Sequence, residues 1–127
     1  MTNLKSLIIA IGLTFISCSN DNWSTQKQEA QNLEKMQAEI LLLSTSTKCE
    51  NPADWAFTSI GSKACGGPAG FIAYSLKLNT TEFLTKVEKY TNCQKEFNTK
   101  WGVISTCDVT PSPTSIECLD GKVQLVY

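Results

Sequence analysis

The sequence predicts a small α+β domain in which disulfides stabilise an antiparallel sheet and one helix packs across that sheet. Two segments have the spacing of amphipathic helices, and five short segments are rich in β-branched and aromatic residues. After the first helix these segments follow the order ββαβββ, which is typical of an antiparallel α+β arrangement. A chain of 127 residues has room for one domain with a small core, and such domains commonly depend on cross-links.

The first 17 residues have the pattern of an export signal. Lys5 precedes an apolar run from Leu7 to Ile16, and the small Ser17 precedes Cys18. The run is too short for a permanent transmembrane helix, so a signal peptide over residues 1–17 fits better than a short membrane anchor.

The stretch Phe15-Ile16-Ser17-Cys18 resembles the lipobox of bacterial lipoproteins, in the relaxed form found in Bacteroidota. The resemblance implies that Cys18 carries the lipid and becomes the mature N-terminus. Ser19 follows Cys18, so the aspartate that signals inner-membrane retention in enterobacteria is absent. We therefore expect a lipid anchor in the bacterial outer membrane, at its periplasmic face or on the cell surface.

Residues 18–48 form the expected tether, and most of this tether is a predicted helix from Thr25 to Leu43. Thr25 and Gln28 have the spacing of a capping box. Such a helix can be a stalk, a short dimerising coil or a helix docked on the domain, and its few heptads argue against the coil. The polar stretch STSTKCENP marks the boundary of the domain at residues 49–127. The apolar face of the helix consists of Leu33, Met36, Ile40 and Leu43.

The domain begins with two predicted strands, at 55–60 and 71–78, and the second alternates apolar with polar side chains. Asn79 with Glu82 predicts the start of a long amphipathic helix, and Gly102 predicts its end.

Three further strands are expected after this helix. Residues 103–108 are rich in β-branched side chains, and a proline-rich loop follows them. The pair Asp120-Gly121 is a strong signal for a two-residue hairpin turn between strands at 116–119 and 122–127.

Export makes disulfides the default state of the cysteines. Cys49 and Cys65 flank the first strand, so a bridge between them would clamp it. Cys107 and Cys118 end two strands joined by the proline-rich loop, which suggests the second bridge. Five cysteines other than Cys18 allow fifteen two-bridge pairings, so these two bridges are an expectation only.

An odd number of cysteines leaves one unpaired, and Cys93 is the expected free thiol. Its position beside Tyr90 and Phe97 places it on the buried face of the long helix, where a thiol behaves as a small apolar group. The alternative, a reactive thiol, needs a lowered pKa that no neighbouring histidine can provide.

The composition argues against most catalytic designs and against nucleic-acid binding. The chain has no histidine, and its eleven basic residues are all lysine. Imidazole bases, histidine-ligated zinc and bidentate arginine contacts are therefore excluded. The net charge is −1 and no basic stripe is present, so no nucleic-acid partner is expected. We expect no enzyme activity, no metal and no cofactor.

The loop CGGPAG is the most unusual stretch of the domain. It lacks the spacing of a phosphate-binding loop and leads into a strand rather than a helix. A disulfide-held loop with an exposed tip suits recognition, because a rigid loop loses little entropy on binding. The candidate contact residues are Lys63, Pro68 and Phe71.

The stretches KACGGP, YS, WGVISTC and DGK together resemble a small uncharacterised domain of secreted and lipid-anchored bacterial proteins, over residues from about 49 to 127. The resemblance implies a compact module outside the cytoplasm and assigns no catalytic residue. The expected function is a non-catalytic binding module for another envelope or extracellular protein, in one version an inhibitor of a protease or muramidase. The alternative is a structural subunit of an envelope complex that docks through the helix at 25–43.

Overall fold

The structure is a computed structural model that describes residues 25–127. The predictions for the signal peptide at 1–17 and for Cys18 lie outside the described residues. The described chain is an α+β fold with two α-helices and two small antiparallel sheets. Its elements in order are α1 (Gln26–Ser44), a 3-10 turn (Pro52–Asp54), β1 (Trp55–Ile60), β2 (Gly70–Ser75), α2 (Thr80–Trp101), β3 (Ser115–Leu119) and β4 (Lys122–Val126).

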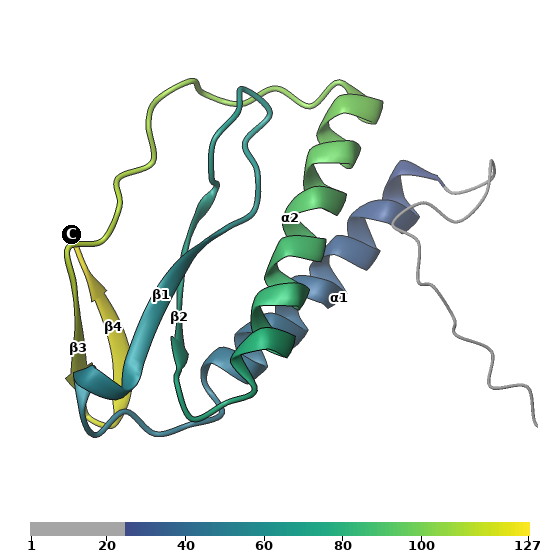
Figure 1. The fold of residues 1–127 in the computed structure, drawn as a ribbon. Helices are drawn as coiled ribbons and strands as arrows, with labels where there is room; N and C mark the ends of the chain where they lie inside the picture. The colour runs from purple at the N-terminus through teal and green to yellow at the C-terminus, as the bar shows by residue number, and fades with distance from the viewer. Residues whose placement is uncertain (1–24) are drawn as a thin grey trace, which may run out of the picture.

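The elements form three layers, which Figure 1 shows from the side. The β1–β2 hairpin lies in the middle, the two helices pack on one face of it, and the β3–β4 hairpin lies on the other side. Each contact between layers has its own core cluster. The helix-side cluster contains Ile40, Ile72, Phe83, Val87 and Tyr90. The hairpin-side cluster contains Cys49, Trp55 and Ala73, with Ile116, Cys118, Val123 and Leu125 packed against them.

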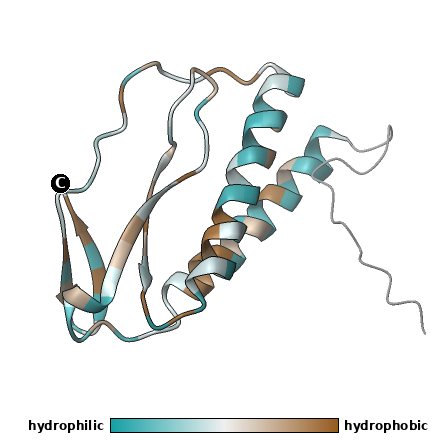
Figure 2. Cartoon of the chain, viewed as in Figure 1, coloured by the Kyte–Doolittle hydropathy of each residue, from teal (hydrophilic) through white to brown (hydrophobic). Residues whose placement is uncertain are grey.

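Strand β2 joins the two clusters because its side chains alternate between the two faces of the hairpin. Ile72 is buried against the helices, whereas its neighbour Ala73 is buried on the side of β3 and β4. Tyr74 again faces the helices, where its ring stacks on Phe83 with a centroid separation of 5.1 Å. The middle layer is therefore covered on both faces, by the helices and by the β3–β4 hairpin. Figure 2 shows hydrophobic residues in each of the three layers, mixed with hydrophilic ones.

Helix α1 starts at a capping box. The Gln28 amide donates to Thr25 Oγ1 at 3.3 Å, and the Thr25 amide donates to Gln28 Oε1 at 2.9 Å. The apolar face of α1 packs against α2 and β2, with Ile40 only 1% exposed. Of the three arrangements considered for this helix, the docked one is present in the structure.

The β1–β2 hairpin pairs Trp55 with Ser75 and Ile60 with Gly70 in an antiparallel register. Strand β1 has the predicted bounds, but β2 ends three residues before the predicted Leu78. Beyond Ser75 the Leu76 amide donates to the Asp54 carbonyl, and the chain turns into α2.

The β3–β4 hairpin confirms the turn predicted at Asp120-Gly121. Both residues have positive φ, at 51° and 77°, as a two-residue type I′ turn requires. Aspartate and glycine tolerate these angles, so the turn is a property of the two residues themselves.

The predicted order ββαβββ is wrong at one element. Residues 103–108 form no strand, and the four strands make two separate two-stranded sheets rather than one sheet. The segment runs beside the loop at 61–69, and that loop closes on itself, with the Lys63 amide donating to the Gly67 carbonyl at 3.0 Å. Since the loop keeps these backbone groups for its own turn, it offers no strand for the segment to pair with.

All four cysteines predicted to form disulfides do so, but the predicted pairing is wrong. The bridges are Cys49–Cys118 and Cys65–Cys107. The layered arrangement brings the chain before β1 against the β3–β4 turn, where the Cys49 amide donates to the Gly121 carbonyl at 2.8 Å. Both bridges therefore join segments from different parts of the chain instead of sequence neighbours.

The prediction of a free thiol at Cys93 is also wrong. Cys93 is buried on α2, as expected, but it is disulfide-bonded. No cysteine among residues 25–127 is a free thiol.

Candidate protein-binding surface

The glycine-rich loop between β1 and β2 is attached to α2 at its base. The Gly61 amide donates to Thr91 Oγ1 at 2.9 Å, and the Ser62 amide donates to Gln94 Oε1 at 2.7 Å. One turn further along α2, Asn98 Nδ2 donates to the Ser62 carbonyl at 2.9 Å. Three helix side chains thus satisfy backbone groups that a loop usually leaves to water.

The tip of the loop is a tight turn. The Gly66 amide donates to the Lys63 carbonyl at 3.0 Å, closing the turn from inside. Gly66 and Gly67 have φ values of 101° and 79°, which side chains with a Cβ rarely adopt. The glycines of CGGP therefore shape a turn, and no ligand is needed to account for them.

The segment at 103–110 lies against the outer side of this loop (Figure 1). The Cys65–Cys107 disulfide joins the two, and the Cys65 amide donates to Ser105 Oγ at 3.1 Å. Further along, Thr110 Oγ1 donates to the Pro68 carbonyl at 2.8 Å. The loop is thus hydrogen-bonded to α2 on one side, and bonded to the segment on the other by a disulfide and two hydrogen bonds.

Lys63 also attaches the loop to the segment. Its ammonium group donates to the Asp108 carbonyl at 2.7 Å and to Asp108 Oδ1 at 3.1 Å. The Lys63 side chain is only 15% exposed, although the Asp108 side chain is 71% exposed. A hydrogen bond from the Thr106 side chain, and then the contact with Lys63, hold the pKa of the Asp108 carboxyl below its usual value.

The other two candidate contact residues are also partly covered. Pro68 is half-buried and its carbonyl is occupied by Thr110. Phe71 is half-buried at the start of β2, where its ring meets the edge of Phe57 at a centroid distance of 6.2 Å. The structure therefore brings Lys63 and Pro68 together in the scaffold of the loop and places Phe71 apart from them, on the strand.

The most exposed large side chains near the loop are Ile104 and Val109. They are 93% and 90% exposed, and both lie on the segment at 103–110. Sequence reasoning missed Ile104 because it was assigned to the predicted strand at 103–108, and it missed Val109 because this residue lies just after that strand. Their spacing of five residues, which fits neither a strand nor a helix face, is the signal that could have separated them from core residues.

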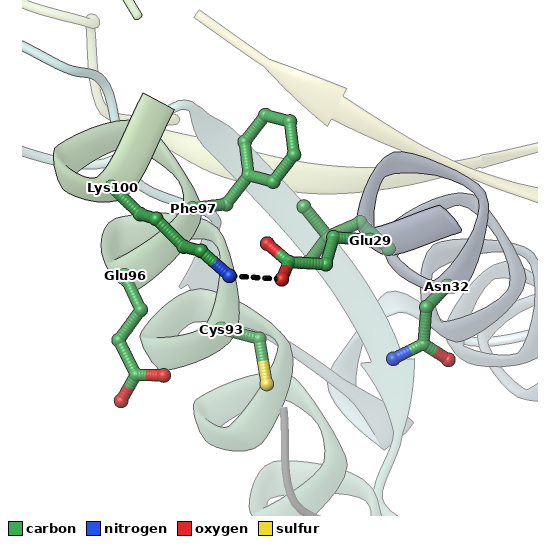
Figure 3. A pocket seen from close by; sticks show the side chains of 7 residues that line it. Glu29, Asn32, Cys93, Glu96, Phe97 and Lys100 are labelled. Carbon is green, nitrogen blue, oxygen red and sulfur yellow. Dashed lines mark hydrogen bonds and ion pairs between the residues drawn. The ribbon is translucent and has the colours of Figure 1, made fainter. Parts of the chain in front are cut away.

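A small cavity lies between α1 and α2, and Figure 3 shows its lining. Its volume is about 120 Å³, room for a few waters but well below the roughly 300–1,000 Å³ of typical ligand sites. Lys100 and Glu29, on opposite helices, form an ion pair across it, and Trp101 Nε1 also donates to Glu29 at 2.7 Å. These charged groups pair with each other, so the cavity has the features of a helix–helix contact rather than of a binding site.

Neither a metal centre nor a membrane span is found in the described part of the chain. Residues 25–127 contain no cluster of three or more His, Cys, Asp or Glu side chains that could hold a metal ion. None of the helices in this range combines the length and apolar character needed to cross a membrane. Comparisons with protein-family models, with curated proteins and with solved structures found no match for this chain.

Proposed function

We propose that this chain is a lipid-anchored, non-catalytic module of the bacterial cell envelope that recognises another protein. The single observation that carries the proposal is the segment at 103–110. It holds two large aliphatic side chains, Ile104 and Val109, almost fully in solvent, while neighbouring residues attach it to the loop through their side chains, namely Ser105, Cys107 and Thr110. Exposed apolar groups on a rigid support favour binding, because little conformational entropy is lost when a partner covers them.

A non-catalytic role is supported by the chemistry of the available side chains. The chain has no histidine and no arginine, and the four cysteines at the segment and in the hairpin-side core are oxidised. The groups near the exposed side chains are a lysine and an aspartate that neutralise each other. This set offers neither an activated nucleophile nor a general base.

The binding proposal is tested by capture of partners from the native envelope with the full chain in mild detergent as bait. We expect the double variant Ile104→Asp with Val109→Asp to lose the partners that the unchanged chain retains. Leu119→Asp is the control, because Leu119 is also exposed, at 55%, but lies on the β3–β4 hairpin. Equal capture by both variants and the unchanged chain would rule out this surface.

The alternative is a structural subunit that docks through α1. Leu41 and Leu42 favour it, since they are 49% and 71% exposed near the end of that helix. The remaining apolar face of α1, however, is already covered by α2. In the same capture experiment, loss of partners with Leu42→Asp and not with the double variant would favour the alternative.

The lipid anchor rests on the resemblance of residues 15–18 to a lipobox. Mass spectrometry of the mature chain is expected to find Cys18 at the N-terminus with a diacylglycerol thioether, and Cys18→Ser is expected to release the protein from membranes. A thioether sulfur cannot also form a disulfide. A Cys18–Cys93 bridge in non-reducing peptide maps would therefore contradict the anchor.

A further inference from the structure

In the segment at 103–110, the residues on both sides of each exposed aliphatic side chain, Ile104 and Val109, are attached to the rest of the domain. Single exposed apolar residues are common on protein surfaces and need no explanation. Ile104 and Val109 differ because the residues on both sides of each are attached to the scaffold.

The attachments around Ile104 come from the end of α2 and from the glycine-rich loop. The Val103 amide donates to the Asn98 carbonyl at 3.0 Å, and Ser105 Oγ accepts from the Cys65 amide at 3.1 Å. The chain is therefore attached on both sides of Ile104, through the backbone of Val103 and the side chain of Ser105, while the Ile104 side chain is 93% exposed.

The attachments around Val109 follow the same plan. Lys63 Nζ donates to the carbonyl of Asp108, and Thr110 donates through its hydroxyl to Pro68. The Cys65–Cys107 disulfide lies between the two exposed side chains along the segment. The whole stretch is thus a rigid ridge with two aliphatic projections.

Most of the ridge backbone takes no part in backbone pairing, although the Asp108 carbonyl accepts from Lys63 Nζ. Within the described chain, no backbone–backbone hydrogen bond outside the helices and strands involves residues 104–113. Figure 1 shows the chain stretched from the end of α2, over the β1–β2 loop and down to β3. A stretched backbone with open N–H and C=O groups is complementary to a concave cleft that binds peptides as an added strand.

We propose that the ridge occupies the substrate cleft of an endopeptidase whose specificity pocket accepts aliphatic side chains, with Ile104 in that pocket. The inference rests on the proposed binding function and names its partner class. Endopeptidases bind substrates as extended chains, and an aliphatic side chain in a dry pocket supplies much of the affinity. Lys63 does not fill such a pocket, because its ammonium group is held by Asp108.

The test measures inhibition of elastase and of trypsin by the full chain in mild detergent. We expect inhibition of elastase at concentrations up to about 10 µM and none of trypsin. Ile104→Lys is expected to weaken inhibition of elastase by about 100-fold and to create inhibition of trypsin. Leu119→Lys adds the same charge at an exposed site away from the ridge and is expected to change neither.

Absence of inhibition of elastase by the unchanged chain overturns the inference, as does inhibition that Ile104→Lys leaves unaltered. Circular dichroism of each variant checks that the fold is intact, and Val109→Lys gives a second, independent substitution on the ridge. If partner capture depends on Ile104 and Val109 while elastase is not inhibited, the inference fails and the proposed binding function stands. If neither partner capture nor elastase inhibition depends on Ile104 and Val109, the inference and the proposed binding function both fail.

Discussion

At the residue scale, Gly61 decides how closely the glycine-rich loop approaches α2. It has a φ of +76°, and a Cβ added there would lie 2.9 Å from Ala69 Cβ and 2.6 Å from Gln94 Oε1. Gln94 cannot move away freely, because its Oε1 accepts the hydrogen bond from Ser62. Only glycine allows both the backbone angle and the contact at this position.

Gly61→Ala is therefore expected to lower the free energy of unfolding by about 1–3 kcal/mol, through backbone strain and loss of the loop contact. Urea denaturation with the disulfides intact measures the change. Gly70→Ala is the matched control, since no atom lies within 4 Å of its added Cβ and its φ is not in the left-handed region. An equal decrease in the free energy of unfolding of the two variants would show that the close approach at Gly61 does not contribute to stability.

Asp108 makes the contact between the ridge and Lys63 dependent on pH. Hydrogen bonding by Thr106, followed by Lys63, holds its pKa below the ordinary 3.8. A carboxyl with a lowered pKa contributes stability above its unfolded pKa, and loses this contribution as the pH falls through the folded value. The contact is thus expected to persist at neutral pH and to weaken only in acid, below about pH 4.

An NMR titration of the Asp108 side chain is expected to give a pKa below 3.8. In Lys63→Met the pKa is expected to rise toward the ordinary value without reaching it, because the hydrogen bond from Thr106 remains. A pKa at or above 3.8 in the unchanged chain would contradict the expectation, as would a titration that Lys63→Met does not alter.

At the scale of elements, two ion pairs connect α1 with α2, and they differ in burial. Glu29 is 9% exposed and accepts from both Lys100 and Trp101. Glu39 pairs with Lys86 at 2.7 Å, but its side chain is 59% exposed. Substitution of a buried carboxylate that accepts two hydrogen bonds lowers the free energy of unfolding more than substitution of a carboxylate that is open to water.

Glu29→Gln is expected to lower the free energy of unfolding by about 1–3 kcal/mol, because it leaves buried donors poorly matched. Glu39→Gln is expected to cost less than about 1 kcal/mol. Both variants remove one negative charge from α1, so urea denaturation compares the buried carboxylate that accepts from two donors with the exposed one. A larger loss for Glu39→Gln would refute the assignment of Glu29 as the main polar contact between the helices.

At the scale of the whole molecule, the two bridges close long stretches of chain, with separations of 69 and 42 residues. In the chain-entropy view each contributes about 4 kcal/mol, a large share of the stability of a small domain. Their surroundings differ. Cys49 is 2% exposed within the hairpin-side core, whereas Cys65 and Cys107 are both exposed at the ridge.

Partial reduction followed by alkylation is expected to label Cys65 and Cys107 before Cys49 and Cys118, because the bridge at the ridge is open to a reductant whereas Cys49 is buried. Peptide mapping by mass spectrometry identifies the labelled pairs and the connectivity together. Earlier labelling of Cys49 would contradict the buried position of its bridge. Peptides that join Cys49 with Cys65 would contradict the connectivity itself.

The elements that the sequence predicts well are those that depend on neighbouring residues. Thr25 and Gln28 cap α1, and Asp120 with Gly121 makes the hairpin turn through backbone angles that these two residues tolerate. Strand β1 and the start and end of α2 follow from local patterns in the same way. In each case the atoms that make the decisive contact are only a few positions apart, so the sequence contains the whole interaction.

The sequence by itself determined the α+β class, the position of the helices and the absence of histidine and arginine side chains, because these depend on local pattern and composition. Only the tertiary structure decided the disulfide pairing, the support of the ridge by the CGGP loop and the exposure of Ile104. The physical reason is that each depends on which distant segments meet. Lys63 contacts Asp108 and Cys49 bonds Cys118 across 45 and 69 positions of chain, and the stacking of the three layers brings them together.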